Sequence, residues 1–421
     1  MKLFKIILTT LFAAIFPTAF CQTYISGGIF SNTTWSAEAS PYIVTGDIAV
    51  YPGITLTVEA GTVVKFNPDL KFFIRGHLLL NGIQNEEIVF TSNAENPAMG
   101  DWTGIILEND QGGQIVGTYV HAEFAETFIE IMSYSTGEIL NLSFSSINHC
   151  SYAIFGYDHP ADYTIKLTND SLTHNNYGVV CGQNLNIQNC VFSDGEKGVH
   201  NWEYNLNTTI KNSEFSNFTI WPLNILGIID SCHIHHNAVG IKMKPVIEVY
   251  DCLIEYNNIG ILCDYSGVQV PGEVIYNNVI CNNTIYNFQH MQNYPINIPN
   301  NCWCSDDEVE IGFTIYDAYD DASLGIVTFT PFKTDCIPTF IANDDWDSQY
   351  YLYPNPAVDY VQLSHTREIS YSIYSINGIE QLRGETEDSI DISSLSKGLY
   401  IVRIADFKGD REVCFRKIVK K

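Results

Sequence analysis

Hydrophobic and polar residues alternate along much of the chain in short runs, such as "DCLIEY" (residues 251–256) and "NIQNCVF" (residues 186–192). Alternation with a period of two is typical of β-strands that have one buried face. Stripes with a helical period do not stand out, and asparagine and glycine are too frequent for helices. The pattern therefore predicts an all-β protein.

These runs recur at a nearly regular interval. Each repeat is centred on one aliphatic or aromatic residue, which we call the anchor, and successive anchors are 19 to 26 residues apart. A period of about 22 residues with variable spacing is typical of a solenoid whose loops absorb insertions. We expect one strand–turn–strand coil per repeat, stacked in register at about 4.8 Å as a parallel β-helix. The anchors are Ile147, Leu172, Phe192, Phe215, Ile234, Ile254 and Ile280.

Other residue types recur at fixed distances from the anchors. Asparagine recurs three places before and three places after, where it suits a left-handed bend and can bond to the asparagines of neighbouring coils. Glycine recurs six places after, as in Gly240 and Gly260, and suits positive φ or a close backbone approach. Cysteine two places before the anchor would point inward and pack as a buried thiol; disulfides between coils are the alternative. Better disulfide candidates are Cys302, Cys304 and Cys336.

Charge divides the chain into two parts. Residues 22–348 contain 9 Lys and Arg against 38 Asp and Glu, a net charge of −29, whereas residues 349–421 contain 10 of each. This break predicts a domain boundary, with an acidic body over residues 22–340, a linker over 341–350 and a small domain over 351–421. The acidic body would repel phosphate backbones, which argues against nucleic acid as a partner.

The amino terminus has the features of a secretory signal peptide. Lys2 and Lys5 precede an apolar run, and small residues stand before a cut after Cys21, so residues 1–21 are expected to be removed. A lipid anchor on Cys21 is the alternative. No later apolar run approaches the roughly 20 residues that a transmembrane helix needs.

Several stretches resemble the opening and closing coils of bacterial right-handed β-helix proteins. They are "YIVTGDIAVYPGITLTVEAGTVVKF" (residues 42–66), "IVFTSNAENPAMGDWTGIIL" (residues 88–107) and the segment 300–332. The resemblance implies a pectate-lyase-like, right-handed parallel β-helix. Such solenoids include lyases, hydrolases and adhesins, so the fold alone does not identify an activity.

The carboxyl-terminal part is expected to be a small immunoglobulin-like antiparallel β-sandwich, with strands broken at "NG", "SKG" and "KG". From "YLYPNPAVDYVQL" to the terminal "KIVKK", its motifs resemble the type A C-terminal sorting domain of the type IX secretion system. The resemblance implies that the secretion machinery is a partner and that the protein crosses the outer membrane to the cell surface or the extracellular space. The motif residues are Pro354, Asn355, Pro356, Gly378, Gly398, Tyr400 and Lys417.

Candidate catalytic residues lie in one column. His149, His174 and Asp194 each stand two places after an anchor, so stacking in register would line them up at a strand edge. Two imidazoles and a carboxylate could bind Zn²⁺ or act as acid and base, and a solvated polar column is the alternative. His233, His235 and Glu255 form a second polar cluster of the same ambiguity.

Motifs of the catalytic β-helix families are mostly missing. β-Helix lyases typically pair carboxylate-bound calcium with an Arg or Lys base, and Arg75 is the sole arginine of the body, far from the regular coils. This argues against an Arg-based lyase, whereas a Lys-based one could use Lys166, Lys197, Lys211, Lys242 or Lys244. Of the motifs of polygalacturonase-type hydrolases, paired aspartates alone occur, in the closing segment. The sequence shows no evident cofactor, although Ca²⁺ would suit so acidic a body.

Aromatic residues are frequent, with 25 Tyr and 23 Phe. Flat rings bordered by Asn and Asp suit stacking against sugars, and covering the core at coil corners is the alternative. We therefore expect a non-catalytic scaffold for glycans or adhesion, with a polysaccharide lyase or glycoside hydrolase as the alternative. The tyrosines considered for sugar contact are Tyr152, Tyr157, Tyr163, Tyr177, Tyr204 and Tyr265.

Overall fold

A computed structural model describes residues 22–132, 136–157, 162–182, 184–201, 207–265, 274–334, 336, 352–353, 357–363, 369–375, 379–386, 388–406 and 413–421. The predicted signal peptide (residues 1–21) and linker (residues 341–350) lie outside these ranges, as do Pro354, Asn355, Pro356 and Gly378 of the sorting motif.

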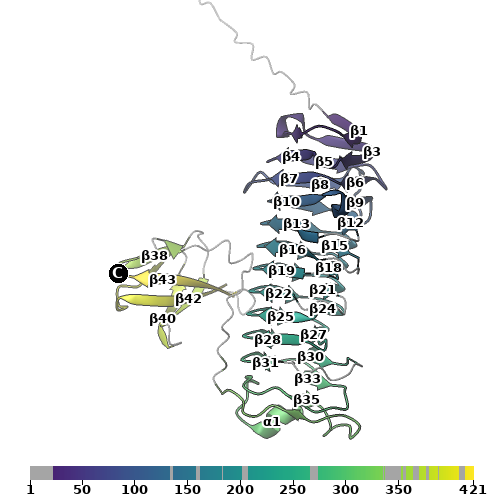
Figure 1. Ribbon diagram of the computed structural model, residues 1–421. Helices are drawn as coiled ribbons and strands as arrows, with labels where there is room; N and C mark the ends of the chain where they lie inside the picture. The colour runs from purple at the N-terminus through teal and green to yellow at the C-terminus, as the bar shows by residue number, and fades with distance from the viewer. Residues whose placement is uncertain are drawn as a thin grey trace, which may run out of the picture.

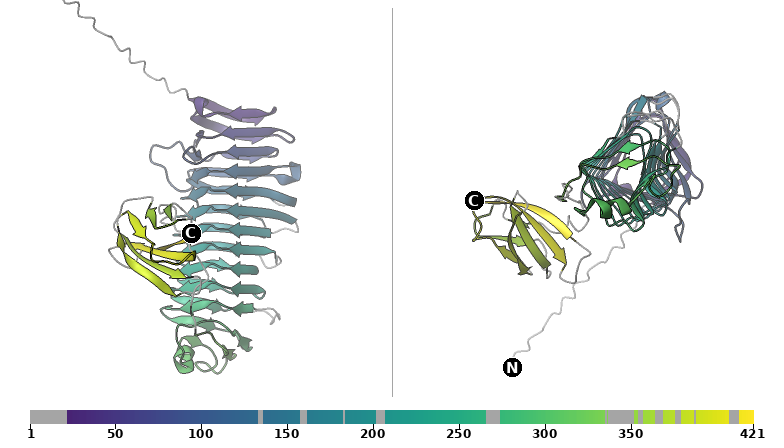
Figure 2. Two further views of the ribbon diagram at one scale, coloured as in Figure 1. Left: turned by 90° about the vertical axis from the view of Figure 1, so that its left-hand side faces the viewer. Right: turned by 90° about the horizontal axis from the view of Figure 1, so that it is seen from below.

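The acidic body is a parallel β-solenoid of about 11 turns, which confirms the predicted β-helix (Figure 1). Each regular coil contains three short strands, rather than the strand–turn–strand unit that the sequence predicted. The coils therefore stack into three parallel faces, which we call the first, second and third sheets, and the view along the solenoid axis shows them surrounding a common interior (Figure 2). The second and third sheets are joined near the start, through residues 42–50, into one sheet of 23 strands.

The first sheet has 11 strands. They are β2 (Thr33–Trp35), β4 (Thr55–Glu59), β7 (His77–Asn81), β10 (Gln114–Thr118), β13 (Thr136–Ser143), β16 (Asp162–Thr168), β19 (Asn184–Gln188), β22 (Thr208–Lys211), β25 (Gly227–Asp230), β28 (Ile247–Tyr250) and β31 (Val274–Tyr276).

The second sheet follows the first after a short turn in each coil. Its strands are β5 (Val63–Phe66), β8 (Ile88–Ser92), β11 (Val120–Glu123), β14 (Ser146–Asn148), β17 (Ser171–Thr173), β20 (Val191–Ser193), β23 (Glu214–Ser216), β26 (His233–His235), β29 (Leu253–Glu255) and β32 (Val279–Cys281).

The third sheet completes each coil. Its strands are β6 (Lys71–Ile74), β9 (Trp102–Leu107), β12 (Ala125–Ile131), β15 (Tyr152–Gly156), β18 (Tyr177–Cys181), β21 (Lys197–Asn201), β24 (Trp221–Asn224), β27 (Val239–Lys242), β30 (Ile259–Cys263), β33 (Tyr286–His290) and β35 (Ile315–Tyr316).

The two ends of the solenoid differ from the regular coils. At the start, β1 (Thr23–Ile29) pairs with β3 (Tyr42–Val50), and β3 in turn pairs with both β5 and β6. At the other end, β34 (Ile296–Asn297) pairs with β36 (Val327–Thr328), and the helix α1 (Glu308–Phe313) begins after Asp307, whose carboxylate accepts two backbone N–H groups. Two 3₁₀ turns, at Ala37–Ala39 and Asn109–Gln111, complete the described elements of the body.

The anchors stack as predicted. Ile147 lies opposite Leu172, Leu172 opposite Phe192, and the register continues without a shift to Ile280. All seven anchors are buried in the continuous core of the solenoid. The rings of Phe192 and Phe215 stack with centroids 4.9 Å apart, so like residues of successive coils contact each other directly.

The recurring asparagines serve two separate purposes. Those three places before an anchor, such as Asn169 and Asn189, hold the left-handed backbone of the first turn, with φ of 58° and 54°. Those three places after an anchor form an amide ladder, in which Asn237 donates to Asn257 and Asn257 donates to Asn283 at 2.9 and 3.0 Å. The first column favours Asn because, apart from Gly, it adopts left-handed backbone most readily. The second column favours Asn because each buried amide forms hydrogen bonds with the amides of the neighbouring coils.

The cysteine column consists of buried free thiols, as predicted. Cys190, Cys232 and Cys252 are free and at most 1% exposed. Each is part of a ladder in which a side chain accepts the backbone N–H of the coil before it: Asp170 N–H to Cys190 Sγ at 3.5 Å, and Cys232 N–H to Cys252 Sγ at 3.4 Å. Burial raises the pKa of the Cys190 and Cys252 thiols above their ordinary value, so they remain protonated.

The carboxyl-terminal domain is a small antiparallel β-structure, as expected from its sequence. It has a three-stranded and a four-stranded sheet that enclose their own core. Its strands are β37 (Leu352–Tyr353), β38 (Tyr360–Leu363), β39 (Ile369–Ser375), β40 (Glu380–Thr386), β41 (Ser389–Asp391), β42 (Gly398–Asp406) and β43 (Val413–Lys420).

Candidate functional site

The predicted catalytic column lies in the turn between the second and third sheets. His149, His174 and Asp194 all adopt left-handed backbone conformations, with φ of 52°, 57° and 59°, and all three side chains are exposed. Asn217, His236 and Tyr256 occupy the same place in the following coils, also at positive φ. The residues are therefore aligned by the repeated turn, on the outer edge of the solenoid.

Contacts along this column run from one coil to the next without converging. The rings of His149 and His174 are nearly parallel, with centroids 5.3 Å apart, and His174 Nε2 lies 4.0 Å from Asp194 Oδ2. Asn217 continues the row by donating to Asp194 at 3.1 Å. A metal ion or a reacting bond needs groups directed at one point, and here each group faces its neighbour in the row.

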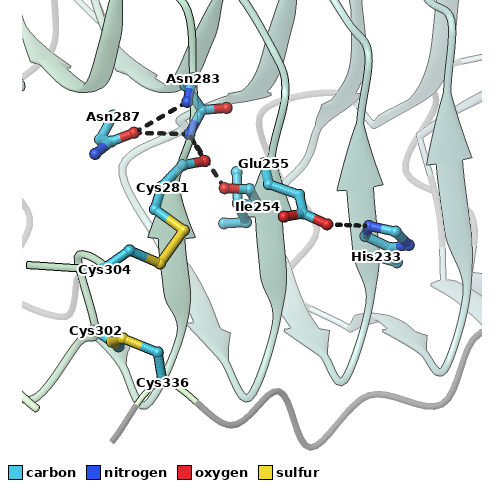
Figure 3. The surroundings of a disulfide bond; sticks show 9 residues. All are labelled: His233, Ile254, Glu255, Cys281, Asn283, Asn287, Cys302, Cys304 and Cys336. Carbon is cyan, nitrogen blue, oxygen red and sulfur yellow. Dashed lines mark hydrogen bonds and ion pairs between the residues drawn. A yellow bond between two sulfur atoms is a disulfide. The ribbon is translucent and has the colours of Figure 1, made fainter. Parts of the chain in front are cut away.

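Among the described residues, three side chains that could ligate a metal bring their ligand atoms within 4.8 Å of one another at Cys302, Cys304 and Cys336. Their sulfur atoms are in disulfides, Cys281–Cys304 and Cys302–Cys336 (Figure 3). The three cysteines that the sequence favoured as disulfide partners are thus all bonded. The first bond ties the last strand of the second sheet to the closing segment, and the second ties this segment to residue 336, shortly before the predicted linker.

The second predicted cluster, of His233, His235 and Glu255, lies on the outer face of the second sheet, where its imidazoles are paired with carboxylates. Together with Glu214, which also takes part, we call these residues the His–Glu cluster. His235 Nε2 lies 2.9 Å from Glu214 Oε1, and His233 Nε2 lies 3.3 Å from Glu255 Oε1, the latter drawn in Figure 3. The rings of His233 and His235 are 4.1 Å apart between centroids. These side chains are 10 to 18% exposed, so the cluster is much less solvated than the edge column.

Glu214 was not predicted from the sequence. It stands one place before the anchor Phe215 and lies opposite His233 in the sheet. Comparing this column from coil to coil would have shown an acid followed by an imidazole. Oε2 of Glu214 is buried and has no hydrogen-bond partner among the described residues.

Aromatic side chains gather on the outer face of the third sheet. The register aligns Tyr152, Tyr177, Lys197 and Trp221 in four successive coils. The tyrosine rings stack with centroids 4.6 Å apart, and Lys197 Nζ lies 5.5 Å from the Tyr177 ring and 5.1 Å from the Trp221 ring. Phe155 packs edge-on against Tyr152 at 5.4 Å.

We call this surface the aromatic patch, defined as Tyr152, Phe155, Tyr157, Tyr177 and Trp221. Tyr157 is 40% exposed, and its ring packs edge-on against Phe155. Its hydroxyl donates to Glu130 at 2.9 Å, a bond that raises the pKa of Tyr157. Partial burial and the neighbouring Glu196 raise the pKa of Tyr177. The patch therefore combines apolar ring surface with hydroxyl and carboxylate groups at its border.

His200 adjoins the patch on strand β21. Its ring centroid lies 5.5 Å from that of Trp221, and its Nδ1 lies 2.9 Å from Asn224 Oδ1. Burial, reinforced by the charge of Lys244, lowers the pKa of His200 to about 4. The imidazole is therefore neutral at pH 7 and acts as a hydrogen-bonding group.

The remaining tyrosines considered for sugar contact differ in their positions. Tyr163 is buried in the core, which contradicts a role in surface contact. Tyr265 is half-buried, and Tyr204 lies outside the described residues. A column comparison five places after the anchors would have separated Tyr152 and Tyr177 from the others.

The described residues of the sorting motif lie in the last two strands of the small domain. Gly398 opens β42 opposite Lys420, and Lys417 lies in β43 opposite Ile401. Tyr400 is 7% exposed and its hydroxyl donates to the Ser396 carbonyl at 2.8 Å. A β-carbon on Gly398 would meet ordinary contacts, so packing in the folded domain does not require glycine there.

Comparison with known proteins identifies both parts of the chain. Residues 351–421 match the secretion system C-terminal sorting domain, and residues 27–126 match the pectate-lyase like beta helix domain. A stretch of 66 residues, 16% of this chain, is 30% identical to Protein bark beetle of Drosophila melanogaster, of whose length it covers 2%. No solved structure matches the chain.

No helix among the described residues is both long enough and apolar enough for a membrane span. The sorting domain provides the means of export through the type IX secretion machinery. The chain is therefore a pectate-lyase-like parallel β-solenoid with a C-terminal sorting domain that directs it, by type IX secretion, to the cell surface or the extracellular space.

Proposed function

We propose that the solenoid is a non-catalytic scaffold that binds carbohydrate at the cell surface or outside the cell, and that the aromatic patch makes the contact. The observation that carries this proposal is the alignment of Tyr152, Tyr177, Lys197 and Trp221 on one outer face. Tyr152, Phe155 and Tyr177 are half-buried and Tyr157 is exposed, whereas Trp221 is 9% exposed and closes the patch at its end. Contiguous aromatic surface that stays partly exposed commonly marks a binding site.

The chemistry of the patch suits a neutral glycan. Ring edges and the exposed ring of Tyr157 offer apolar contact to the C–H faces of sugars, and the tyrosine hydroxyls, Glu130 and Glu196 offer hydrogen bonds to sugar hydroxyls. The net charge of −29 on the body disfavours polyanionic glycans in the absence of Ca²⁺. A chain laid parallel to the solenoid axis would meet one row of the patch per coil.

The arrangement of the acids and bases supports binding over catalysis. A lyase or hydrolase needs an acid and a base on the two sides of one bond. His149, His174 and Asp194 instead follow one another along an exposed edge, and the His–Glu cluster pairs its groups internally.

Glycan retention tests this proposal. The purified protein is passed over immobilised neutral and acidic polysaccharides, with and without Ca²⁺, and the eluate is assayed for unsaturated sugars and reducing ends. We expect retention on a neutral glycan without product. The double variant Tyr152→Ala/Tyr177→Ala should bind at least ten-fold more weakly, because the apolar ring edges of both tyrosines and their hydroxyls are lost.

A matched control is available on the first sheet. Tyr250 and Tyr276 are also stacked in register, with centroids 5.4 Å apart, and Tyr250→Ala/Tyr276→Ala should leave retention unchanged. Equal loss in both double variants would count against the patch. Release of unsaturated sugars or reducing ends would instead establish the enzymatic alternative.

A further inference from the structure

The two polar columns of the solenoid meet at one contact, between His235 at the end of β26 and His236 in the following turn. Their Nδ1 atoms are 2.7 Å apart, and the two rings are nearly perpendicular, at 85°. Two imidazole nitrogens approach this closely when one carries a proton and the other accepts it. The contact therefore directs two nitrogen lone-pair positions at a single shared atom.

Glu214 fixes the orientation of His235 from the opposite side of the ring. Its Oε1 lies 2.9 Å from His235 Nε2, and Glu214 is 8% exposed. A carboxylate in this position holds the Nε2–H of the imidazole and leaves Nδ1 to act as the acceptor. His235 is thus held with Nδ1 facing His236.

We propose that Nδ1 of His235 and Nδ1 of His236 bind a divalent transition-metal ion, with Glu214 as the carboxylate that orients His235. The ion takes the place of the shared proton, which His236 then carries on its Nε2 because its ring is exposed to solvent, and the two rings turn and separate so that both Nδ1 atoms reach the ion. The sequence carboxylate, imidazole, metal is the usual second-shell arrangement at protein metal sites. Water completes the coordination, because His236 is exposed.

The donor set determines the class of ion. Imidazole nitrogen suits Cu²⁺, Ni²⁺ and Zn²⁺, whereas Ca²⁺ and Mg²⁺ prefer oxygen ligands. The surroundings favour a cation, since Glu255 pairs with the adjacent His233 and Oε2 of Glu214 is buried without a hydrogen-bond partner among the described residues. The acidic body as a whole raises the local concentration of cations.

The edge column provides an internal comparison. His174 has the same left-handed backbone as His236, with φ of 57° and 56°. Its neighbour His149 lies parallel to it at 5.3 Å, and Nδ1 of His149 is hydrogen-bonded to Asn148 at 2.8 Å. His149 and His174 therefore share the turn but lack the facing nitrogens.

Calorimetric titration of the chelator-treated full chain with Zn²⁺, and separately with Cu²⁺, tests the proposal. His236→Asn should abolish one equivalent of binding, and it preserves the fold because Asn217 occupies the same left-handed position one coil earlier. Glu214→Gln should lower the affinity of this site for the ion ten- to a hundred-fold, the usual effect of losing a carboxylate that orients a metal-binding histidine. His174→Asn is the control and should bind as the wild type does.

A second measurement guards against a misfolded variant. In the proton NMR spectrum, substoichiometric Cu²⁺ should broaden the imidazole signals of His235 and His236 before those of His149 and His174. Absence of binding to the wild type, or an unchanged titration of His236→Asn, would overturn the proposal. Loss of binding in His174→Asn would do the same, because it would place the ion on the edge column.

Discussion

The carbonyl oxygen of Gly260 lies 2.5 Å from the point that a β-carbon on Gly240 would occupy. Gly198 and Gly178 are related in the same way, with 2.6 Å between the Gly198 oxygen and the added carbon. Both contacts involve backbone of the next coil, which moves only with the whole strand. Glycine in this column is required by the close stacking of coils, because neither residue has positive φ.

Gly240→Ala should therefore destabilise the solenoid. A methyl group inside contact distance of a fixed carbonyl should cost roughly 1–3 kcal/mol, the usual range for overpacking. Thermal unfolding monitored by circular dichroism measures the effect. Gly312→Ala is the control, since a β-carbon there meets nothing within 4 Å; a comparable fall in both variants would contradict the steric argument.

The amide ladder makes a second prediction. Asn257 is fully buried, donates to the Ile234 carbonyl at 3.0 Å and accepts the backbone N–H of Asn237 at 3.0 Å. Asn257→Ala leaves these buried groups without partners, at about 1–3 kcal/mol each. We expect a loss of at least 2 kcal/mol in urea unfolding. The exposed Asn217→Gly, which keeps the left-handed backbone accessible, should change stability little.

Asp170 should make stability depend on pH. It is 2% exposed, and burial raises its pKa to about 7. Because the folded state holds this proton more tightly than the unfolded state, the protein should lose stability as pH rises from about 4 to about 7, by a few kcal/mol in total.

Asp170→Asn should remove this dependence. The asparagine can copy Asn278, which occupies the same column and accepts the N–H of Cys252 at 3.0 Å. Melting temperatures at pH 5 and pH 8 measure the effect. If the variant shows the same difference between the two pH values as the wild type, Asp170 is not the responsible group.

The paired disulfides should protect the carboxyl end of the solenoid. A solenoid unfolds from its ends, where each coil has a single neighbour. Cys302 and Cys336 enclose a loop of sequence separation 34, so Cys302→Ser/Cys336→Ser should lower the local stability by about 3 kcal/mol. Hydrogen exchange in β32 and β33 should accelerate in the variant, with exchange in β5 and β8 as the control. Equal exchange in wild type and variant would show that the bond is not a constraint.

The stacking of the coils could be predicted from the sequence, because residues that contact each other in successive coils must be similar and therefore recur along the chain. Ile234 and Ile254 are such a pair, opposite each other in adjacent coils. The third strand of each coil was not predictable. Its apolar residues follow those of the second strand after a turn that contains a single left-handed residue. In several coils this residue is one that seldom adopts positive φ, such as His149 or Tyr256, so the sequence does not indicate a turn there as glycine would.

The candidate sites were predictable only in part. Alignment of His149, His174 and Asp194 followed from the repeat, but their exposure depended on which side of the turn they lie. The contact of His235 with His236 was hidden, because adjacent residues of a strand point to opposite faces and a left-handed turn alters that rule. Tyr152, Tyr157 and Tyr177 of the aromatic patch were among the tyrosines considered for sugar contact, but Trp221 was missed because an extra residue moves it one place from the position of Lys197 in the repeat.

In the described coils between Ala122 and Cys263 the cysteines are thiols, and neighbouring coils are held together by hydrogen bonds and side-chain packing. Disulfide bonds occur at the closing end of the solenoid. Each of these coils offers the following coil the same arrangement of hydrogen-bond donors and acceptors that the preceding coil offers to it. Duplication or deletion of some twenty codons would therefore lengthen or shorten the rod without redesigning its interior. The length of the solenoid is therefore the property that evolution can change with the fewest other substitutions, while the fold stays the same.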